Sequence, residues 1–221
     1  MTPYLIYGAD ISPYMQRLTV QLDIKGLAYE VTPPPGGLRS DAFRAINPIG
    51  KIPVLRAGDF ILPESDVICD YVEDIHPEPA LRPTTPGARA RARLIARIVD
   101  LYVMGPMTPL FGQLRRSGRD ATVVDPAIAA IDAGLSCLDR AIDDRGHAVG
   151  DALSLADLAA APVLRYIVQY LPVFDRADPL AAHPRLAAYW PAIAAQPDIA
   201  RGIARIEAGW TALRAAAKSP N

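Results

Sequence analysis

The sequence predicts a small α/β domain followed by an all-helical domain. Over about the first 78 residues, short β-forming runs alternate with helical segments. Beyond residue 86 the chain is rich in Ala, Leu, Ile and Arg at helical spacing, without strand-like alternation. The intervening segment is rich in proline, with three prolines in residues 76–83. We therefore predict an α/β domain over 1–78, a linker over 79–86 and a helical domain over 87–221.

Composition places the chain among globular proteins and narrows its partners. Of its 221 residues, 51% are hydrophobic and 21% are charged, and the formal net charge is −1. That balance predicts no nucleic-acid partner, and the absence of a long apolar run predicts no membrane span. No secretory signal is visible, and two distant cysteines, Cys69 and Cys137, fit a reducing compartment. With its three histidines scattered, we expect a cytoplasmic protein without a metal.

The elements of the first domain follow from local signals. Strands are predicted at 4–7, 29–31, 54–55 and 60–62, and the last two form a hairpin about a tight turn at 57–59. A helix begins with Ser12 as its N-cap and Pro13 at its first position, and it ends near Gly26. A short helix is expected over 40–46. A further helix, over 65–74, has Ser65 as its predicted N-cap.

In the helical domain, proline positions set the expected boundaries and bends. A long helix should run from about Thr85 towards Phe111 or Arg116 and bend at Pro106 and Pro109, since each proline removes a helical hydrogen bond. Further helices are predicted over 126–143, 154–169, 184–195 and 198–217.

The stretch from Asn47 to Leu55 combines turn residues with the start of a strand. Pro53 lies where a strand should begin and cannot donate a backbone hydrogen bond. The alternatives are a trans proline entering an edge strand and a cis Ile52–Pro53 bond. We favour the cis bond, which would offer the backbone of Ile52 to an extended, peptide-like ligand.

The pattern Asn-Pro-x-Gly-Lys-Ile-Pro-Val-Leu at 47–55, followed by Pro63-Glu64-Ser65 and an all-helical segment, resembles the glutathione transferase superfamily. The resemblance covers essentially the whole chain. It implies a thioredoxin-like first domain that binds glutathione, a second domain that lines the pocket for a hydrophobic electrophile, and a homodimer acting in detoxification.

The matched residues fit a ligand with two carboxylates. Glu64 and Ser65 stand at a predicted helix N-terminus, where free N–H groups and the helix dipole favour an anion. The resemblance implies that Ile52, beside Pro53, pairs its backbone with the cysteinyl part of glutathione, and that Lys51 lies near the glycyl carboxylate. Asp100 is a further candidate for the ligand's ammonium group. Taken singly, each of these side chains could equally be an ordinary cap or a surface charge.

Ser12 is the main catalytic candidate. A hydroxyl at a helix N-terminus can donate to a thiolate, and the helix dipole stabilises the same charge, so both lower the pKa of a bound thiol. The resemblance implies a Ser-type member, in which glutathione supplies the nucleophile. Tyr7 is the rival hydroxyl, with a core aromatic as its alternative role, and Tyr14 is a weaker option.

Other residues have expected roles outside the thiol site. The electrophile pocket is expected to use apolar and aromatic side chains. The candidates are Met104, Pro106, Met107, Phe111 and Tyr166, for which ordinary helix packing is the alternative. Ser154 and Asp157 form a capping box of structural importance. Arg17 is interpreted as a solvated residue or a dimer contact.

The leading functional hypothesis is a cytosolic glutathione transferase that adds glutathione to electrophilic small molecules. Alternatives on the same scaffold are a glutathione-dependent isomerase, an ether-cleaving enzyme and a dehalogenating enzyme. A non-catalytic glutathione-binding stress protein is the alternative outside enzymes.

Overall fold

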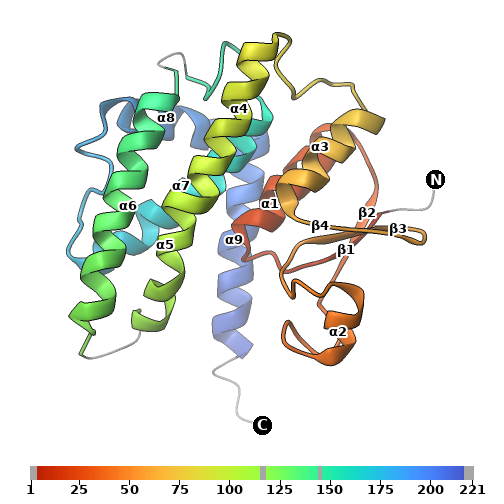
Figure 1. Ribbon diagram of the computed structural model, residues 1–221, viewed down its shortest axis with the longest axis horizontal. Helices are drawn as coiled ribbons and strands as arrows, with labels where there is room; N and C mark the ends of the chain where they lie inside the picture. Colours follow the sequence, from red (N-terminus) through yellow and green to blue (C-terminus); the bar gives the residue numbers. More distant parts are fainter. Residues whose placement is uncertain (1–3, 115–117, 144–145, 217–221) are drawn as a thin grey trace. The chain divides into compact units, whose positions relative to one another are not determined.

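The computed structural model describes residues 4–114, 118–143 and 146–216, and its internal contacts divide the chain into two units (Figure 1). The first unit comprises Met1–Leu81 together with Gln196–Asn221, and the second comprises Arg82–Ala195. The first of the two boundaries, after Leu81, lies inside the linker predicted at 79–86. The last helix groups with the first unit by its contacts, whereas the sequence places it at the end of the helical segment 87–221.

The first unit contains a four-stranded mixed sheet in the order β2-β1-β3-β4. The strands are β1 (Tyr4–Tyr7), β2 (Tyr29–Thr32), β3 (Val54–Ala57) and β4 (Phe60–Pro63). β1 pairs with β2 in parallel and with β3 antiparallel, and β3 and β4 form the predicted hairpin. Gly58, at φ +63°, makes that hairpin's tight turn. The predicted thioredoxin-like mixed sheet is thus confirmed.

Helices cover both faces of this sheet. α1 (Pro13–Ile24) and α3 (Ser65–Ile75) lie on one face, and α2 (Asp41–Ile46) lies on the other (Figure 1). The last helix, α9 (Pro197–Ala216), packs along α1. α1 is therefore enclosed between α3 and α9, and every residue from Met15 to Leu22 is buried.

Of the two N-caps predicted in this unit, the one at Ser12 is confirmed, and Ser40 caps α2 in the same way. The Ser12 side chain accepts a hydrogen bond from the Met15 N–H, and Ser40 accepts one from the Phe43 N–H. The prediction that Ser65 is the N-cap of α3 is wrong. Glu64 occupies the cap position at φ 71° and ψ 107°, without a capping side-chain bond, and Ser65 is the first helical residue.

All the secondary-structure elements in the described residues of the second unit are helices, which confirms the predicted class. Its α-helices are α4 (Pro86–Ile98), α5 (Gly105–Met107), α6 (Ala121–Ala141), α7 (Leu155–Tyr170) and α8 (Pro184–Ala195). A π-helical segment, Val99–Met104, joins α4 to α5, and a 3-10 segment, Thr108–Gln113, follows. The expected long helix therefore changes its winding before Pro106, and Arg116 lies outside the described residues.

The predicted start of the next helix at Pro126 is wrong. α6 begins at Ala121, where the Asp120 carboxylate caps the helix by accepting from the Thr122 N–H at 3.0 Å. Pro126 lies inside the helix, where it forfeits a single hydrogen bond to a carbonyl four residues earlier.

α7 begins with a capping box between Ser154 and Asp157. The Asp157 carboxylate accepts from the Ala148 and Ser154 N–H groups, the Ser154 hydroxyl and the Tyr189 hydroxyl. These contacts tie the start of α7 to α8 and to the preceding loop.

Two segments of the second unit, Pro86–Gln113 and Ala121–Ala141, are long and apolar enough to cross a membrane by length and composition. Core helices of soluble proteins satisfy the same criterion, so this is weak evidence for a span.

Candidate functional site

Three loops leave the sheet of the first unit at the same end. In the register of the strands, Tyr7 is opposite Val54, and Val54 is opposite Pro63. The loop after Tyr7 leads to Ser12, the loop before Val54 contains Ile52–Pro53, and Glu64 follows Pro63 directly. The sheet therefore brings the predicted thiol-activating, backbone-pairing and anion-binding residues to one edge.

Ser12 is held in an orientation that leaves its hydroxyl proton free to donate. Its backbone N–H donates to the Ala9 carbonyl at 2.9 Å, and its Oγ accepts from the Met15 N–H at 3.3 Å. Because the cap uses a lone pair of Oγ, the O–H group can point to a ligand. The positive end of the α1 dipole lies at the same place. Both features favour a negatively charged sulfur beside Ser12.

The structure places the two rival hydroxyls differently. Tyr7 lies in a core cluster with Phe43 and Val54, its ring centroid 6.2 Å from that of Phe43. Its ring is 7% exposed, so it has the surroundings of the alternative role, a core aromatic. Tyr14 is half-buried, and the Arg17 guanidinium lies 5.6 Å from its ring centroid.

The Ile52–Pro53 peptide bond is cis, as predicted. The buried Asn47 side chain holds the loop 47–51 that precedes this bond. Its amide nitrogen donates to the Lys51 carbonyl at 2.9 Å, and its amide oxygen accepts from the Ile49 N–H at 3.1 Å. The Lys51 side chain is exposed, while Ile52 packs against the Tyr7 cluster. Asn47 therefore fixes the backbone that is expected to meet the ligand.

Glu64 and Ser65 form the third part of the site. Glu64 is exposed and adopts a positive φ, which is costly for a residue other than Gly and is found most often at functional sites. Ser65 is 7% exposed and stands at the N-terminus of α3, a position that favours an anion.

Arg17 also belongs to this site, a role that the sequence alone did not indicate. It is 2% exposed, so its interpretation as a solvated residue is wrong. Its Nη1 lies 3.4 Å from Ser65 Oγ and 3.9 Å from Asp66 Oδ1. A buried guanidinium beside the N-terminus of α3 adds positive potential where a carboxylate is expected. The signal in the sequence is the row Arg17, Gln21 and Lys25, whose i, i+4 spacing marks one polar face of the helix.

The predicted pocket residues lie in the second unit. Met104 and Met107 are buried, at 5% and 0% exposure. Phe111 and Tyr166 meet edge to face at 5.8 Å, and both contact Tyr170, which the sequence analysis did not select. These rings form one aromatic cluster.

Two further candidates are placed without a defined role. Pro106 is half-buried in α5, and Asp100 is half-buried on the π-helical segment.

Neither cysteine lies on the three loops that bring Ser12, Ile52 and Ser65 together. Cys69 is buried and burial raises the pKa of its thiol, which disfavours the thiolate. Cys137 is exposed on α6, in the second unit. Within the described ranges, no group of three or more His, Cys, Asp or Glu side chains is arranged to hold a metal ion. The expected absence of a metal stays a prediction.

Models of two protein families match most of the chain. The glutathione S-transferase N-terminal domain matches residues 6–80, and the glutathione S-transferase C-terminal domain matches residues 109–189. The first range contains every residue of the three-loop edge described above.

Individual proteins agree with these matches. A maleylacetoacetate isomerase of Pseudomonas aeruginosa is 32% identical over 198 residues, covering 82% of this chain and 92% of that protein. Glutathione S-transferase 3 of Zea mays is 29% identical and covers 93% and 96%. A crystal structure of a glutathione S-transferase from Methylobacterium radiotolerans, in complex with glutathione sulfonate, is 30% identical with a TM-score of 0.76, covering 91% of this chain and 95% of that one. With both domain models matched and the mixed sheet and helical unit in place, the chain belongs to the glutathione S-transferase family.

Proposed function

We propose that this protein activates the thiol of glutathione at Ser12 and adds it to electrophilic small molecules. The observation that carries the proposal is the Ser12 hydroxyl, which caps α1 through a lone pair and keeps its proton available at the edge where Ile52–Pro53 and Ser65 also lie. Glutathione fits this edge because it carries a thiol between two carboxylate-bearing ends.

In this proposal each end of glutathione meets a different part of the site. The γ-glutamyl carboxylate binds at Ser65, supported by the N-terminus of α3 and the Arg17 guanidinium. The backbone of Ile52 pairs with the cysteinyl residue, and the Lys51 ammonium lies near the glycyl carboxylate. Asp100 remains a candidate for the ammonium group.

The chemical step needs only the thiolate. The thiol loses its proton to solvent, and Ser12 donates a hydrogen bond to the resulting sulfur anion while the α1 dipole stabilises it. The sulfur lone pair then forms a bond to the electrophilic carbon. In a substitution, a leaving group departs with its electron pair. When the thiolate instead adds to a double bond, the neighbouring carbon takes up a proton. In the unit expected to receive the electrophile, the half-buried Phe111 ring packs on the buried rings of Tyr166 and Tyr170.

The test separates binding from thiol activation. Glutathione affinity is measured by calorimetry, and the pKa of the bound thiol is measured from thiolate absorbance as a function of pH. A hydrogen bond to a charged group is worth ~1.5–3 kcal/mol, so Ser12→Ala should raise the thiol pKa by about one to two units. Conjugation to an aryl halide should fall accordingly.

Ser40→Ala is the control, because Ser40 caps α2 by accepting from the Phe43 N–H, as Ser12 accepts from the Met15 N–H. The Ser40 hydroxyl also donates to the Pro35 carbonyl, so Ser40→Ala should lose at least about 1 kcal/mol of stability without changing the thiol pKa. A thiol pKa that moves in Tyr7→Phe and not in Ser12→Ala would overturn the assignment to Ser12. Absence of glutathione binding by the native protein would overturn the whole proposal.

A second candidate is glutathione-dependent cis–trans isomerisation, which is favoured by the relatives named maleylacetoacetate isomerase. There the same thiolate would add to a double bond, the resulting single bond would rotate, and elimination would return glutathione. Conjugation consumes one glutathione per turnover, whereas isomerisation consumes none. Measuring free thiol during turnover of a cis-enoic acid and of an aryl halide therefore distinguishes the two activities.

We further propose a cytoplasmic homodimer that acts in detoxification. Large apolar side chains are exposed on each unit: Phe60 and Val67 on the first, and Leu101 and Tyr102 on the second, at 46–57% exposure. Adjacent exposed apolar side chains, such as Leu101 and Tyr102, are the kind of surface that a protein interface covers. Sedimentation of the purified protein at micromolar concentration tests the dimer, and a monomer under those conditions contradicts it.

A further inference from the structure

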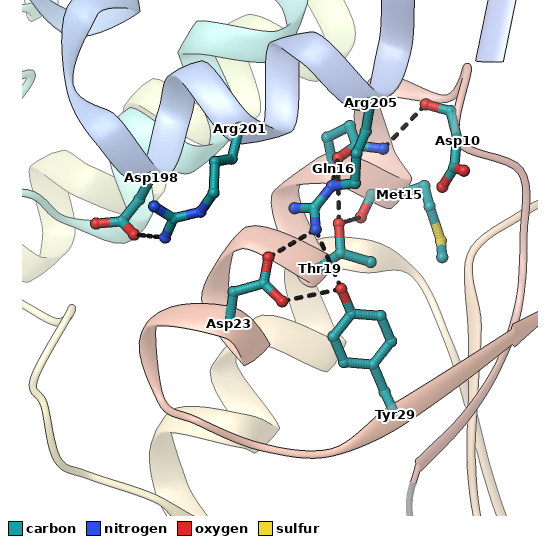
Figure 2. Close-up of polar contacts among 9 residues, drawn as sticks. All are labelled: Asp10, Met15, Gln16, Thr19, Asp23, Tyr29, Asp198, Arg201 and Arg205. Atoms are coloured by element: carbon teal, nitrogen blue, oxygen red, sulfur yellow. Dashed lines mark hydrogen bonds and ion pairs between the residues drawn. The ribbon is translucent and has the colours of Figure 1, made fainter. Parts of the chain in front are cut away.

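The C-terminal helix contributes one arginine to the helix that carries Ser12. Arg205, on α9, donates from Nε to Gln16 Oε1 at 3.0 Å and from Nη1 to Asp23 Oδ2 at 2.6 Å (Figure 2). The same Nη1 lies 3.2 Å from the Tyr29 hydroxyl, which donates to Asp23 Oδ1 at 2.9 Å. All of these residues belong to the first unit.

The contact with Arg205 and a hydrogen bond from the Thr19 hydroxyl, at 3.2 Å, together fix which way the Gln16 amide faces (Figure 2). A guanidinium can only donate, so the Gln16 atom facing Arg205 is the oxygen. The amide nitrogen is then turned to the Asp10 carbonyl, to which it donates at 2.9 Å (Figure 2). Because Gln16 is fully buried, turning its amide the other way would leave buried polar atoms without hydrogen bonds, which is costly.

Asp10 lies in the loop that positions Ser12. The loop runs from Gly8 to Ile11, and the Ser12 N–H closes it by donating to the Ala9 carbonyl. Gln16 thus spans from the second turn of α1 to the middle of the loop. Arg205 therefore holds Gln16, and Gln16 in turn restrains the loop that carries Ser12.

Two glycines let α9 approach closely at both ends of this contact. A Cβ added at Gly209 would lie 3.0 Å from Ile11 Cγ2 and 3.2 Å from the Ile11 nitrogen. A Cβ at Gly202 would lie 2.6 Å from Val20 Cγ2. α9 therefore packs directly on the Ser12 loop as well as on α1, so the arginine is not an isolated surface contact.

We propose that α9 fixes the position of the Ser12 hydroxyl through Arg205 and Gln16, which makes Arg205 a positioning residue for thiol activation. The inference rests on the proposed function of Ser12. Arg205 does not touch the thiol in this account. Its charge faces Asp23 and the Tyr29 hydroxyl, with Asp10 nearby, so the neighbouring carboxylates offset much of its direct electrostatic effect. Its influence runs through the orientation of Gln16.

Four variants separate positioning from simple docking of α9. Arg205→Met and Gln16→Met each break the relay, while Arg205→Lys can keep the ion pair with Asp23 but lacks the planar fork that also reaches Gln16. Arg201→Met is the matched control. Arg201 lies one turn earlier on α9 and pairs with Asp198 on the same helix.

The first readout is the pKa of the bound glutathione thiol. We expect Arg205→Met and Gln16→Met to raise it by about one unit, within the range expected for loss of a hydrogen bond to a thiolate. Arg205→Lys should recover stability but not the thiol pKa, and Arg201→Met should change neither by a measurable amount. In the double variant Arg205→Met/Gln16→Met the shift should be no larger than in either single variant, because both act on the same contact.

The second readout needs no ligand. Amide hydrogen exchange at Ser12 and Met15 should be at least threefold faster in Arg205→Met than in Arg201→Met, since both amides are held by the loop and the cap. Unchanged exchange in a folded Arg205→Met protein overturns the positioning role, as does an additive double variant. If the native protein binds no glutathione, the function of Ser12 is wrong, and the exchange experiment still decides whether α9 holds the loop.

Discussion

A buried ion pair in the first unit gives a stability prediction whose size can be worked out from its contacts. Lys25 Nζ lies 2.7 Å from Glu73 Oε1, and the two side chains are 0% and 2% exposed. The ammonium also donates to the His76 and Pro79 carbonyls, at 2.8 and 2.9 Å. Its three protons are therefore all used, and they join the end of α1 to α3 and to the segment that follows α3.

Replacing Lys25 with Met removes the charge at similar length and leaves Glu73 buried. The carboxylate keeps two donors, Gln21 Nε2 at 3.1 Å and the Leu81 N–H at 3.2 Å. Breaking a buried pair by removing one partner costs ~3–5 kcal/mol, and the two remaining donors place this site at the lower end, about 3 kcal/mol. For a chain of this size that corresponds to a fall in Tm of about 6–12 °C.

The assay is urea unfolding followed by circular dichroism, with thermal unfolding beside it. Arg56→Met, at an exposed residue, is the control and should change stability by less than ~0.5 kcal/mol. The double variant Lys25→Met/Glu73→Gln should be more stable than Lys25→Met, because a neutral amide oxygen still accepts from Leu81 without a buried charge. A cost below 1 kcal/mol for Lys25→Met, or a double variant less stable than the single, would refute this reasoning.

Three further predictions concern backbone strain, alkaline pH and the capping box. At Glu64, with φ 71°, Gly should be more stable than Ala by about 1 kcal/mol, the reverse of the usual order, and equal urea midpoints for the two variants would argue against strain. Burial raises the pKa of Tyr29 to about 12, against about 10 in an unfolded chain, so the unfolded state loses its proton first and stability falls as pH rises from 10 to 12. Tyr29→Phe should flatten that decline in urea titrations across this range; an unchanged slope contradicts the assignment. Tyr189→Phe removes the hydroxyl that donates to Asp157 at 3.0 Å and should cost about 2 kcal/mol, with an unshifted urea midpoint as the contrary result.

Local signals in the sequence were enough for most of the first unit. The strand 4–7, the hairpin about Gly58 and the start of α1 each depend on residues adjacent in the chain, and all three are present. The cis bond before Pro53 could also be predicted, since only a following proline makes the cis isomer low in free energy. Together these residues define the edge where the site is assembled.

The errors occurred where a boundary depends on a competing signal or on the tertiary structure. The sequence predicts a helix start at Pro126, although Asp120 is the stronger N-cap signal and a helix tolerates one missing hydrogen bond. The prediction of Ser65 as a cap fails because the positive φ of Glu64 cannot be inferred from residue type. Whether α9 groups with the first unit depends on packing against α1, which lies nearly two hundred residues earlier.

The most informative error concerns α1, because its Arg17 is expected to be solvated and is instead buried. A helix enclosed on two sides must bury polar groups as well as apolar ones, and each buried polar group needs a partner. The partners occur in two rows. Arg17, Gln21 and Lys25 face Ser65, the Cys69 carbonyl and Glu73, on or beside α3.

Gln16 and Asp23, in the other row, face Arg205 on α9. A shift of α1 by one residue would rotate both rows away from their partners, and would leave buried charges and amides unsatisfied at a cost of several kcal/mol. Apolar contacts alone tolerate small displacements better, because they have no fixed direction. The polar rows therefore set the register of α1, and with it the place of Ser12 at its first turn. This gives a reason for polar residues in a helix that is otherwise part of the core: they position the hydroxyl on which the proposed chemistry depends.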